Sequence, residues 1–423
     1  MKKYNVIVIG GGLSGVCAAI SAARENKSVL LIEEGYHLGG TATKCLINPF
    51  MKFHLHNGKS ISTCTRVNQG LFSEIIYELS KLHGIDFKDM DNIVFNNEYL
   101  KVILENMCLK YNVEILYGAK VTSVELNKNL ISSIEIFNQQ GFSKVEANYF
   151  IDCSGDANIA AYANVPFRVG REKDNFTQPL TLCFDIANVD MAEFKKERPL
   201  ITPKYVEFKE KGLIHNPREN VLMFPCSIPN AIHFNTTRIT NLSSLNATDF
   251  SKAQIEGRRQ MMEMFKFLKE NFKSFKDSQI MNSASIVGVR ESRMIDGLYT
   301  LKEEDIKEYR KFEDGIACSC YNIDIHSPDG EGTHIFYLDP NNYYSIPYRC
   351  LITKQYDNLI VAGRCISSTH EAQSSLRIMP VVANIGEAAG IAAALACNKM
   401  ISVKDIDVSL LQKVIQDNGG KCF

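Results

Sequence analysis

Near the amino terminus stands the stretch Val6-Ile7-Val8-Ile9-Gly10-Gly11-Gly12-Leu13-Ser14-Gly15, which decides the fold of this 423-residue chain. Four apolar residues end at a glycine cluster and a helix-compatible segment follows, so the predicted order is strand, tight turn, helix. Gly10, Gly12 and Gly15 match the dinucleotide fingerprint G-x-G-x-x-G. The first glycine permits the turn, the second lets a pyrophosphate approach the backbone, and the third lets helix and strand pack closely. The stretch therefore predicts a unit that binds a dinucleotide.

An acid at the end of the second strand strengthens this interpretation. Residues 28–32 read as a strand that ends at Glu33, near the spacing expected for a carboxylate that binds the ribose. Free amides at the start of the helix would face the phosphates, and the pair Gly39-Gly40 lets backbone pass close to a cofactor. A glycine-rich turn without a ligand is the alternative, and the strand, helix and acid together argue against it. The nucleotide contacts predicted in this region are Gly10, Gly12, Leu13, Ser14, Gly15, Glu33, Glu34, Gly40 and Thr41.

Composition and charge restrict the class of protein. With 45% hydrophobic residues and a net charge of −1, the chain is an ordinary globular protein, long enough for two or three domains. It has no Lys/Arg tract, so we expect neither nucleic acid nor a membrane as a partner. The 13 cysteines include no C-x-x-C pair, which predicts no metal site and fits reduced thiols in the cytoplasm. The apolar stretch from Val381 to Cys397 is broken by Glu387 and glycines, so we expect a buried helix and no membrane span.

Two helices and then a group of strands are predicted after the first glycine turns. Apolar side chains recur at helical spacing in residues 72–84 and 97–110. Turn residues at 127–129 and 139–141 suit hairpins between the strands that follow. The last strand runs into Asp152-Cys153-Ser154-Gly155-Asp156, a small-residue turn where backbone can touch a nucleotide a second time. The predicted strands are Val113–Tyr117, Lys120–Glu125, Ile131–Phe137 and Lys144–Ile151.

Residues 166–349 differ in character and predict an inserted α+β substrate domain. Strand-like pieces at 180–186 and 231–235 surround an amphipathic helix from about Lys252 to Phe272. We expect the apolar stripe of that helix to pack in a core and to have no cofactor role.

The chain then returns to the nucleotide-binding pattern. Residues 358–363 predict a strand that ends in glycine, and a polar loop from Arg364 to Ser375 follows. Pro380 suits the first turn of the next helix, and Gly386 and Gly390 allow that helix to pack closely on a neighbour. We therefore predict an α/β fold with a Rossmann-type domain in two parts, residues 1–165 and 350–423, around the substrate domain of residues 166–349.

Several ordered segments together resemble one family. Over nearly its whole length the chain is similar to the FAD-dependent oxidoreductases of the glutathione-reductase structural class. It most resembles a bacterial group related in fold to succinate dehydrogenase flavoprotein subunits. The resemblance is specific for FAD and for the fold, and it does not specify a substrate. Besides the first glycine turn, the matching segments are Leu38-Gly39-Gly40-Thr41, residues 152–156, Asn235-Thr236-Thr237-Arg238, residues 288–293, Asp324-Ile325-His326, Ile346-Pro347-Tyr348-Arg349, residues 362–367 and His370-Glu371-Ala372.

The resemblance implies FAD as the cofactor and assigns roles along the chain. Val121 would meet the adenine through its backbone, and the helix near Pro380 would direct its amino terminus at the pyrimidine edge of the flavin. Arg364 stands where this class often has an acid, so no acid is expected to hydrogen-bond the ribityl chain there. The further residues implied to lie against the cofactor are Val121, Cys153, Ser154, Gly155, Gly363 and Arg364.

Four polar side chains are predicted to lie near the substrate. An arginine can bind a carboxylate through two parallel hydrogen bonds, and a histidine can transfer a proton near neutral pH. His370 is favoured because it stands in a loop just before the flavin-facing helix. The segment Arg290-Glu291-Ser292-Arg293 could instead form an internal salt-bridge cluster. The predicted catalytic residues are His370, Arg290, Arg293 and Arg377.

Missing motifs narrow the chemistry. No C-x-x-x-x-C follows Gly40, where a disulfide reductase would carry its redox pair, and no second G-x-G-x-x-G indicates a dedicated NAD(P)H domain. Cys45 is either a lone reactive thiol or, more commonly for this residue type, a buried packing residue. Covalent attachment of FAD stays open, with His54, His56 and Cys365 as candidates.

We therefore predict a cytoplasmic FAD-dependent oxidoreductase, a dehydrogenase or reductase, that acts on a small organic substrate by hydride transfer at flavin N5. One alternative is a flavin monooxygenase of the same fold. Others are an FAD-containing RNA-modifying protein, against which the near-neutral charge argues, and a flavoprotein subunit without catalytic activity.

Overall fold

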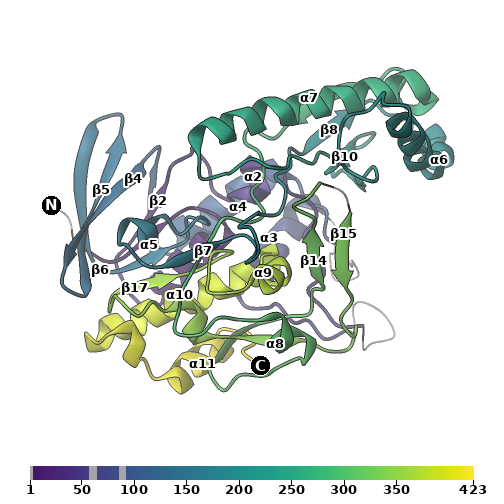
Figure 1. The fold of residues 1–423 in the computed structure, drawn as a ribbon. Helices are drawn as coiled ribbons and strands as arrows, with labels where there is room; N and C mark the ends of the chain where they lie inside the picture. Colours follow the sequence, from purple (N-terminus) through teal and green to yellow (C-terminus); the bar gives the residue numbers. More distant parts are fainter. Residues whose placement is uncertain (1–2, 57–63, 85–91, 331) are drawn as a thin grey trace.

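The computed structural model describes residues 3–56, 64–84, 92–330 and 332–423 of the chain. A seven-stranded sheet in the order β3-β2-β1-β6-β5-β4, with β17 also paired to β6, occupies the left of the molecule in Figure 1. It contains the strands predicted from the sequence, and the α/β fold is confirmed. Its strands are β1 (Lys3–Ile9), β2 (Val29–Glu33), β3 (Glu114–Tyr117), β4 (Lys120–Asn127), β5 (Leu130–Asn138), β6 (Gly141–Asp152) and β17 (Leu359–Val361).

The parallel part of the sheet brings distant turns to one edge. Ile9 of β1 is aligned with Ile32 of β2 and with Asp152 of β6, and Val361 of β17 is aligned with Asp152 on the other side. Since parallel strands end at the same edge, the turns that follow β1, β6 and β17 lie next to one another. In open α/β sheets this carboxyl edge is where ligands bind.

β6 belongs to both parts of the sheet. Its carboxyl-terminal residues pair in parallel with β1 and β17, and its amino-terminal residues pair antiparallel with β5. β5 pairs antiparallel with β4, so the predicted hairpins are present. This arrangement places the turn between β3 and β4 beside the end of β2, where Ala119 N donates to Glu33 O.

Two helices, α1 (Leu13–Arg24) and α10 (Met379–Lys399), pack in direct backbone contact. A Cβ atom on Gly386 would lie 2.0 Å from the carbonyl oxygen of Ser14, and one on Gly390 would lie 2.1 Å from that of Ala18. Only glycine permits such an approach, so the predicted role of these two glycines is confirmed. The two contacts advance in the same direction along both helices, and the helices are therefore parallel.

The helix α10 is also the most apolar helix of the described chain. By length and composition it could cross a membrane, but 89% of its most apolar window is buried inside the protein. It contacts β1, β6 and β17 of the sheet and the helix α3 (Leu71–His83). It is therefore a core helix, as predicted.

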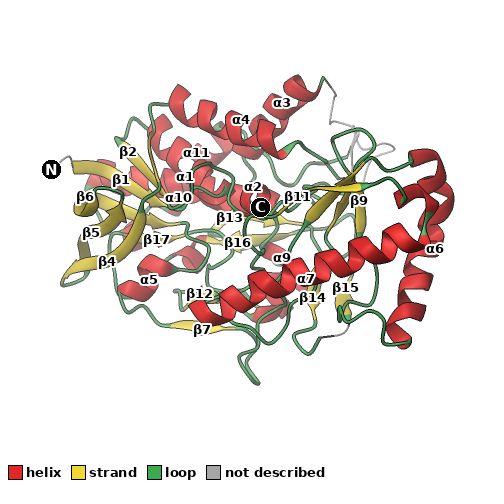
Figure 2. Ribbon diagram, turned by 90° about the horizontal axis from the view of Figure 1, so that it is seen from above, coloured by secondary structure: helices red, strands yellow, loops and turns green. Residues whose placement is uncertain are grey.

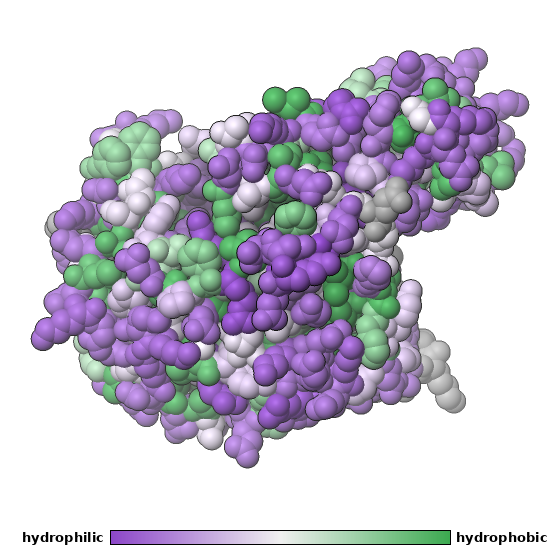
Figure 3. Space-filling view, viewed as in Figure 1, coloured by the Kyte–Doolittle hydropathy of each residue, from purple (hydrophilic) through white to green (hydrophobic). Residues whose placement is uncertain are grey.

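A second, antiparallel sheet forms the upper right of the molecule (Figure 1). Its core includes the stacked rings of Phe184 and Phe234, whose centroids are 5.0 Å apart, and the inner face of α7 (Ala247–Asn271). Figure 2 shows α7 on the side of the molecule opposite α3 and α4 (Asn97–Lys110), and Figure 3 shows that the part carrying α6 and α7 projects beyond the remaining surface. The strands are β8 (Phe184–Ala187), β9 (Met223–Pro225), β10 (Ile232–Phe234) and β11 (Gln279–Ser283), in the order β11-β8-β10-β9.

Two helices differ from the sequence expectation. The predicted polar loop from Arg364 to Ser375 contains α9 (His370–Leu376), which begins because Thr369 Oγ1 accepts a hydrogen bond from Ala372 N. The helix α6 (Met191–Glu210), not predicted as an element, is capped by Asp190 although it contains two prolines.

The remaining strands form small two-stranded sheets outside the two larger sheets. Ile316 and Tyr344, in the paired strands β13 (Gly315–Ser319) and β16 (Tyr344–Pro347), belong to the same core as α1 and α10. The boundary at residue 349 between the predicted domains stays a prediction. The other elements are α2 (Thr41–Lys44), α5 (Asn158–Tyr162), β7 (Phe167–Val169), β12 (Arg293–Ile295), α8 (Glu303–Lys307), β14 (Ile323–His326), β15 (Thr333–Phe336) and α11 (Val408–Asp417), with short 3-10 turns at 273–275, 348–351 and 403–405.

Candidate active site

The turn after β1 is built as its glycines predict. Gly10 has φ +100°, and a Cβ there would lie 2.4 Å from the carbonyl oxygen of Cys153. A Cβ on Gly15 would lie 1.8 Å from the carbonyl oxygen of Gly10, so the third glycine permits close packing. Gly12 differs, because the nearest atom to a Cβ there is Gly40 Cα at 3.9 Å. Open space in front of Gly12 is what a pyrophosphate needs.

Two helix amino termini face this edge. Leu13 begins α1 and Met379 begins α10, and in both helices the cap residue accepts no side-chain hydrogen bond and the first turn holds no acid. Their amide groups are therefore available to an anion. Because Gly386 lies against Ser14, α10 extends about 10 Å beyond the start of α1 at 1.5 Å per residue. One positive helix end can serve the pyrophosphate and the other the flavin ring, and both roles stay predictions.

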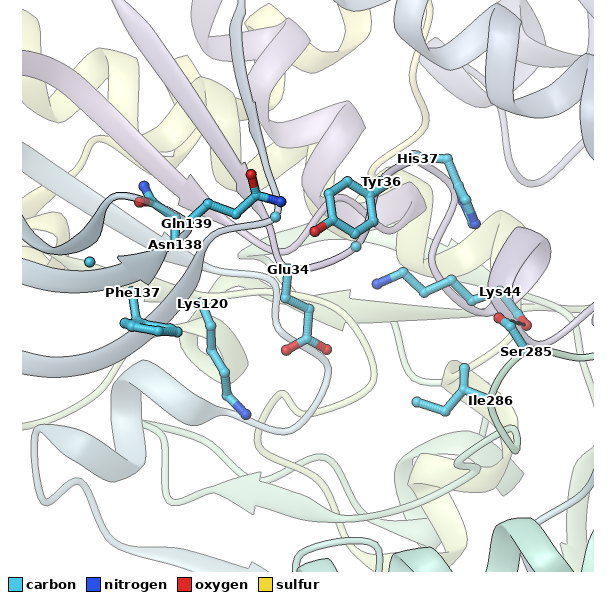
Figure 4. A pocket seen from close by; sticks show the side chains of 13 residues that line it. Glu34, Tyr36, His37, Lys44, Lys120, Phe137, Asn138, Gln139, Ser285 and Ile286 are labelled. Carbon is cyan, nitrogen blue, oxygen red and sulfur yellow. Dashed lines mark hydrogen bonds between the residues drawn. The ribbon is translucent and has the colours of Figure 1, made fainter.

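An open cavity of about 830 Å³ lies at the end of β2. Figure 4 shows Tyr36 and Lys44 on one side, Lys120 and Phe137 on the other and Glu34 between them, with Ser285 and Ile286 below Lys44. This is the position expected for the adenosine part of the cofactor. Val121, implied to meet the adenine, is buried directly beside Lys120.

Glu33 does not line this cavity, unlike Glu34. One carboxylate oxygen of Glu33 accepts from Gly11 N at 2.8 Å, and the other accepts from Gly35 N at 2.6 Å and pairs with Lys44. Both oxygens are therefore occupied within the chain, and this acid shapes the turn. Contact of Glu33 with a ribose stays a prediction.

The turn after β6 is held by a buried acid. Asp152 accepts hydrogen bonds from the backbone amides of Ser154, Ile159 and Ala160, and burial raises its pKa. Cys153 Sγ lies 3.8 Å from Ser14 Oγ, which joins this turn to the start of α1.

Arg364 is fixed by a side chain that the prediction did not include. Its Nη2 lies 2.7 Å from Asp156 Oδ1, and its guanidinium lies across Gly155, where a Cβ would be 2.6 Å from Nη1. Gly363 has φ +104°, and a Cβ there would lie 3.6 Å from the Ser14 side chain. The turns after β1, β6 and β17 therefore surround one region, and the glycine pattern and two free helix ends fit FAD.

His370 forms a buried pair with Glu291. His370 is the first residue of α9, and its Nδ1 lies 2.8 Å from Glu291 Oε1. Gln178 N donates to the other oxygen of Glu291 at 2.9 Å. The carboxylate requires a proton on Nδ1, which leaves His370 Nε2 without a partner among the described residues. A histidine held in this way can accept a proton at Nε2 and release it again.

Two of the predicted arginines lie next to this pair. Arg377 Nη2 donates to Gln178 Oε1 at 3.3 Å, and the backbone oxygen of Arg290 accepts from Gln373 Nε2 at 2.8 Å. Gln178 and Gln373 bond to each other at 3.1 Å. Burial, followed by the charge of Arg377, lowers the pKa of Arg290 to about 9. The sequence did not predict the two glutamines or the role of Glu291. These residues lie far in sequence from the side chains that they contact, so no local motif contains both partners.

Arg293 is not brought together with the other three predicted catalytic residues, which corrects that expectation. It begins β12, which pairs with β7, and its guanidinium lies over the ring of Phe167, 5.3 Å from the centroid. Its Nη1 donates to Asp156 O at 2.9 Å and to Asn158 Oδ1 at 3.1 Å. Nor do residues 290–293 form an internal salt-bridge cluster, because Glu291 pairs with His370.

The candidates for covalent chemistry are mostly buried. Burial raises the pKa of the Cys365 thiol and of the Cys45 thiol to about 12, so both stay protonated. Cys45 Sγ lies 3.7 Å from Val287 O, in agreement with the packing role. His54 is buried against Phe53, and His56 is exposed.

A fingerprint turn, a second glycine turn and a returning strand and helix at one sheet edge define a Rossmann-type flavoprotein. The family model described as FAD dependent oxidoreductase matches residues 5–415, and the chain belongs to this family. It is an oxidoreductase with FAD as its cofactor.

Matches to individual proteins are more distant. A vinyl phenol reductase of Lactiplantibacillus plantarum is 45% identical over 40 residues, which is 10% of this chain and 8% of that protein. The match thus spans less than a tenth of that relative. A geranylgeranyl bacteriochlorophyll reductase-like protein of Thermoplasma acidophilum has a TM-score of 0.48 at 11% identity, covering 99% of this chain and 84% of the other. A flavin-dependent brominase has a TM-score of 0.48 at 12% identity, covering 98% and 83%.

Proposed function

We propose that the protein is a dehydrogenase or reductase that transfers a hydride between a small organic substrate and FAD, with His370 as the residue that moves the proton. The observation that supports this proposal most directly is the Glu291–His370 pair, at 2.8 Å, whose histidine begins α9, the helix directly before α10. Its free Nε2 and the adjacent arginines provide proton transfer and binding in one place.

When bound, FAD accepts or donates a hydride at N5. In the oxidative direction a C–H bond of the substrate would break, and its hydrogen would leave as hydride to the flavin. The proton on the substrate atom next to that carbon goes to His370 Nε2. Glu291 stabilises the imidazolium that forms, because its carboxylate stays 2.8 Å from Nδ1. Reduction of a substrate is the same step reversed, and His370 then donates the proton.

Anaerobic flavin bleaching tests this function. The purified FAD-loaded protein is mixed with a panel of small metabolites, and the oxidised flavin absorbance is followed; photoreduced enzyme is mixed with the same panel for the reverse direction. We expect one chemical class to change the absorbance, and His370→Gln to slow that change by about 100-fold or more at unchanged FAD content. The exposed His215, which pairs with Glu263, provides the matched control, His215→Gln, which should react at the original rate.

The monooxygenase alternative predicts a different result. In that case no compound bleaches the flavin without oxygen, and substrate-dependent oxygen consumption requires NAD(P)H. That outcome would replace the dehydrogenase proposal. We also infer a cytoplasmic location from the 13 cysteines, which include no C-x-x-C pair and fit reduced thiols, and no nucleic-acid or membrane partner from the near-neutral charge. A salt-sensitive RNA complex would contradict the second inference.

A further inference from the structure

Four arginines from four separate segments have charges that act on one buried histidine, His326, which Gln178 links to the Glu291–His370 pair. We call this set the arginine cluster; it comprises Arg218, Arg238, Arg290, Arg377 and His326. Arg238 Nη2 lies 3.5 Å from His326 Nδ1. Gln178 Oε1 accepts hydrogen bonds both from Arg377 Nη2 and from the backbone amide of His326. The cluster is therefore continuous with the candidate catalytic residues.

The cluster is buried to a degree that arginines rarely reach without an anionic partner. Arg238 is 1% exposed, Arg218 4% and Arg290 8%. Burial, strengthened by the four guanidinium charges, holds the pKa of His326 well below its usual value. His326 is therefore neutral, and the positive charge resides in the arginines.

The chain supplies too little negative charge to balance them. Glu219 lies 3.0 Å from Arg238, and Asp324, which accepts from Tyr321, is the second carboxylate near the cluster. Among the described residues, four arginines against these two carboxylates leave an excess of two positive charges. Glu291 lowers this excess to one while His370 is neutral, and the excess returns to two when His370 is protonated.

Unused hydrogen-bond donors also indicate that the cluster has too few anionic partners. Arg218 Nη1 and Arg377 Nε are buried and have no hydrogen-bond partner within the described residues. The guanidinium of Arg290 donates one hydrogen bond there, to Pro179 O at 2.6 Å. Leaving buried charged donors unsatisfied destabilises the folded protein. A bound anion would remove this cost.

We propose that the arginine cluster is the substrate site and that the substrate is a small organic dianion, carrying two carboxylates or a carboxylate and a phosphate. This proposal rests on the function proposed above and names its substrate class. Planar guanidinium groups can each bind an oxyanion through two parallel hydrogen bonds, which lysines could not do. Gln178, between the cluster and Glu291, places a substrate held by the arginines next to His370 Nε2.

Anion binding to the FAD-loaded enzyme tests the site independently of turnover. The probes are malonate, succinate and glutarate, with butyrate as the monoanion, succinamide as the neutral analogue and inorganic phosphate as the other dianion source. Thermal unfolding and the flavin difference spectrum report binding. We expect at least one dicarboxylate to bind tenfold or more tightly than butyrate, and succinamide to bind no better than butyrate. Phosphate binding with tenfold advantage over the dicarboxylates would support the site and assign a phosphorylated substrate.

A variant pair locates the binding. Arg218→Gln should weaken dianion binding by about 30-fold or more at unchanged FAD content, because Arg218 offers a free donor. Arg259→Gln is the control, since Arg259 is half exposed on α7 and pairs with Glu256. If Arg218→Gln does not fold, the comparison of dicarboxylates with butyrate and succinamide on the original protein tests the proposal.

Two results would overturn the site: equal binding of neutral and dianionic analogues, or unchanged dianion binding in Arg218→Gln. Failure of the proposed function looks different. In that case dianions bind at the cluster, but under anaerobic conditions no saturated dianion reduces the flavin and no unsaturated or keto dianion oxidises the reduced flavin.

Discussion

The turn after β1 and the arginine cluster, which we propose as the cofactor side and the substrate side of one site, are built in different ways. The turn consists of backbone: glycines remove side chains, and two helix ends offer amide groups. The cluster consists of long side chains that converge from segments up to 159 residues apart, from Arg218 to Arg377. The cofactor side is therefore local in sequence, and the substrate side is a property of the tertiary fold.

This difference indicates how each side should respond to substitution. A methyl group added on the glycine side either meets backbone that cannot move, which changes the fold, or fills space that the cofactor needs, which changes the cofactor affinity. A truncated side chain on the substrate side leaves the fold in place and changes binding or rate. The experiments below test this division, beginning with the largest expected effect.

Gly386→Ala should prevent folding. The added Cβ would lie 2.0 Å from Ser14 O, so α10 and α1 would have to separate along their whole contact. We expect loss of soluble protein, or a destabilisation above about 4 kcal/mol, as for severe overpacking of a core. The measurement is chemical unfolding of the purified protein. Ala389→Gly in the same helix is the control and should cost about 1 kcal/mol; equal effects of the two changes would contradict the backbone contact.

Gly12→Ala should retain the fold and lose the cofactor. Gly12 has φ −69°, which alanine adopts freely, and its Cβ would meet no atom closer than 3.9 Å. That methyl group would occupy the space in front of the α1 amino terminus. We expect FAD affinity to fall by about 100-fold, equivalent to about 3 kcal/mol, measured by flavin content and fluorescence titration. A fully yellow protein with unchanged affinity would show that the pyrophosphate binds elsewhere.

The same division explains what the sequence could predict. Gly10, Gly12 and Gly15 specify a strand, a turn and a helix within ten residues, so the sheet and the cofactor edge were predictable. Glu291 was not, because its partner His370 is 79 residues away and its role depends on a buried contact. Arg293 is close to Arg290 in sequence, yet its strand pairing with β7 takes it to Asp156. Spacing predicts backbone geometry better than it predicts which side chains meet.

Glu291→Gln should slow the reaction without loss of FAD. The amide keeps the shape of the carboxylate but removes the charge that stabilises a protonated His370. We expect the rate of flavin bleaching to fall by about 10- to 100-fold, as for other partners that orient a functional histidine, and its pH dependence to shift. Glu371→Gln, at the next position of α9, is the control and should react normally. If Glu291→Gln leaves the rate and its pH profile unchanged, the Glu291–His370 pair has a structural role only.

A second buried glutamate, on the cofactor side, provides the most specific test. Glu387 in α10 is 2% exposed and accepts hydrogen bonds from Leu71 N at 3.2 Å and from Asn384 Nδ2 at 3.4 Å, but it pairs with no cation among the described residues. Burial raises its pKa from 4.5 to about 7.

Because the folded-state pKa is raised, the folded protein keeps this proton while the unfolded chain loses it between pH 4.5 and 7. The contribution of Glu387 to stability is therefore complete below pH 4.5 and is lost as the pH rises to 7, at a cost of about 3 kcal/mol. Glu387→Gln cannot ionise, so its free energy of unfolding should fall less than that of the original protein between pH 5 and pH 7.5. Glu78→Gln, on the surface of α3, should leave the pH dependence unchanged. If the free energy of unfolding of Glu387→Gln depends on pH as that of the original protein does, the folded protein does not hold Glu387 protonated. The cofactor side would then contain a buried charge, as the arginine cluster does.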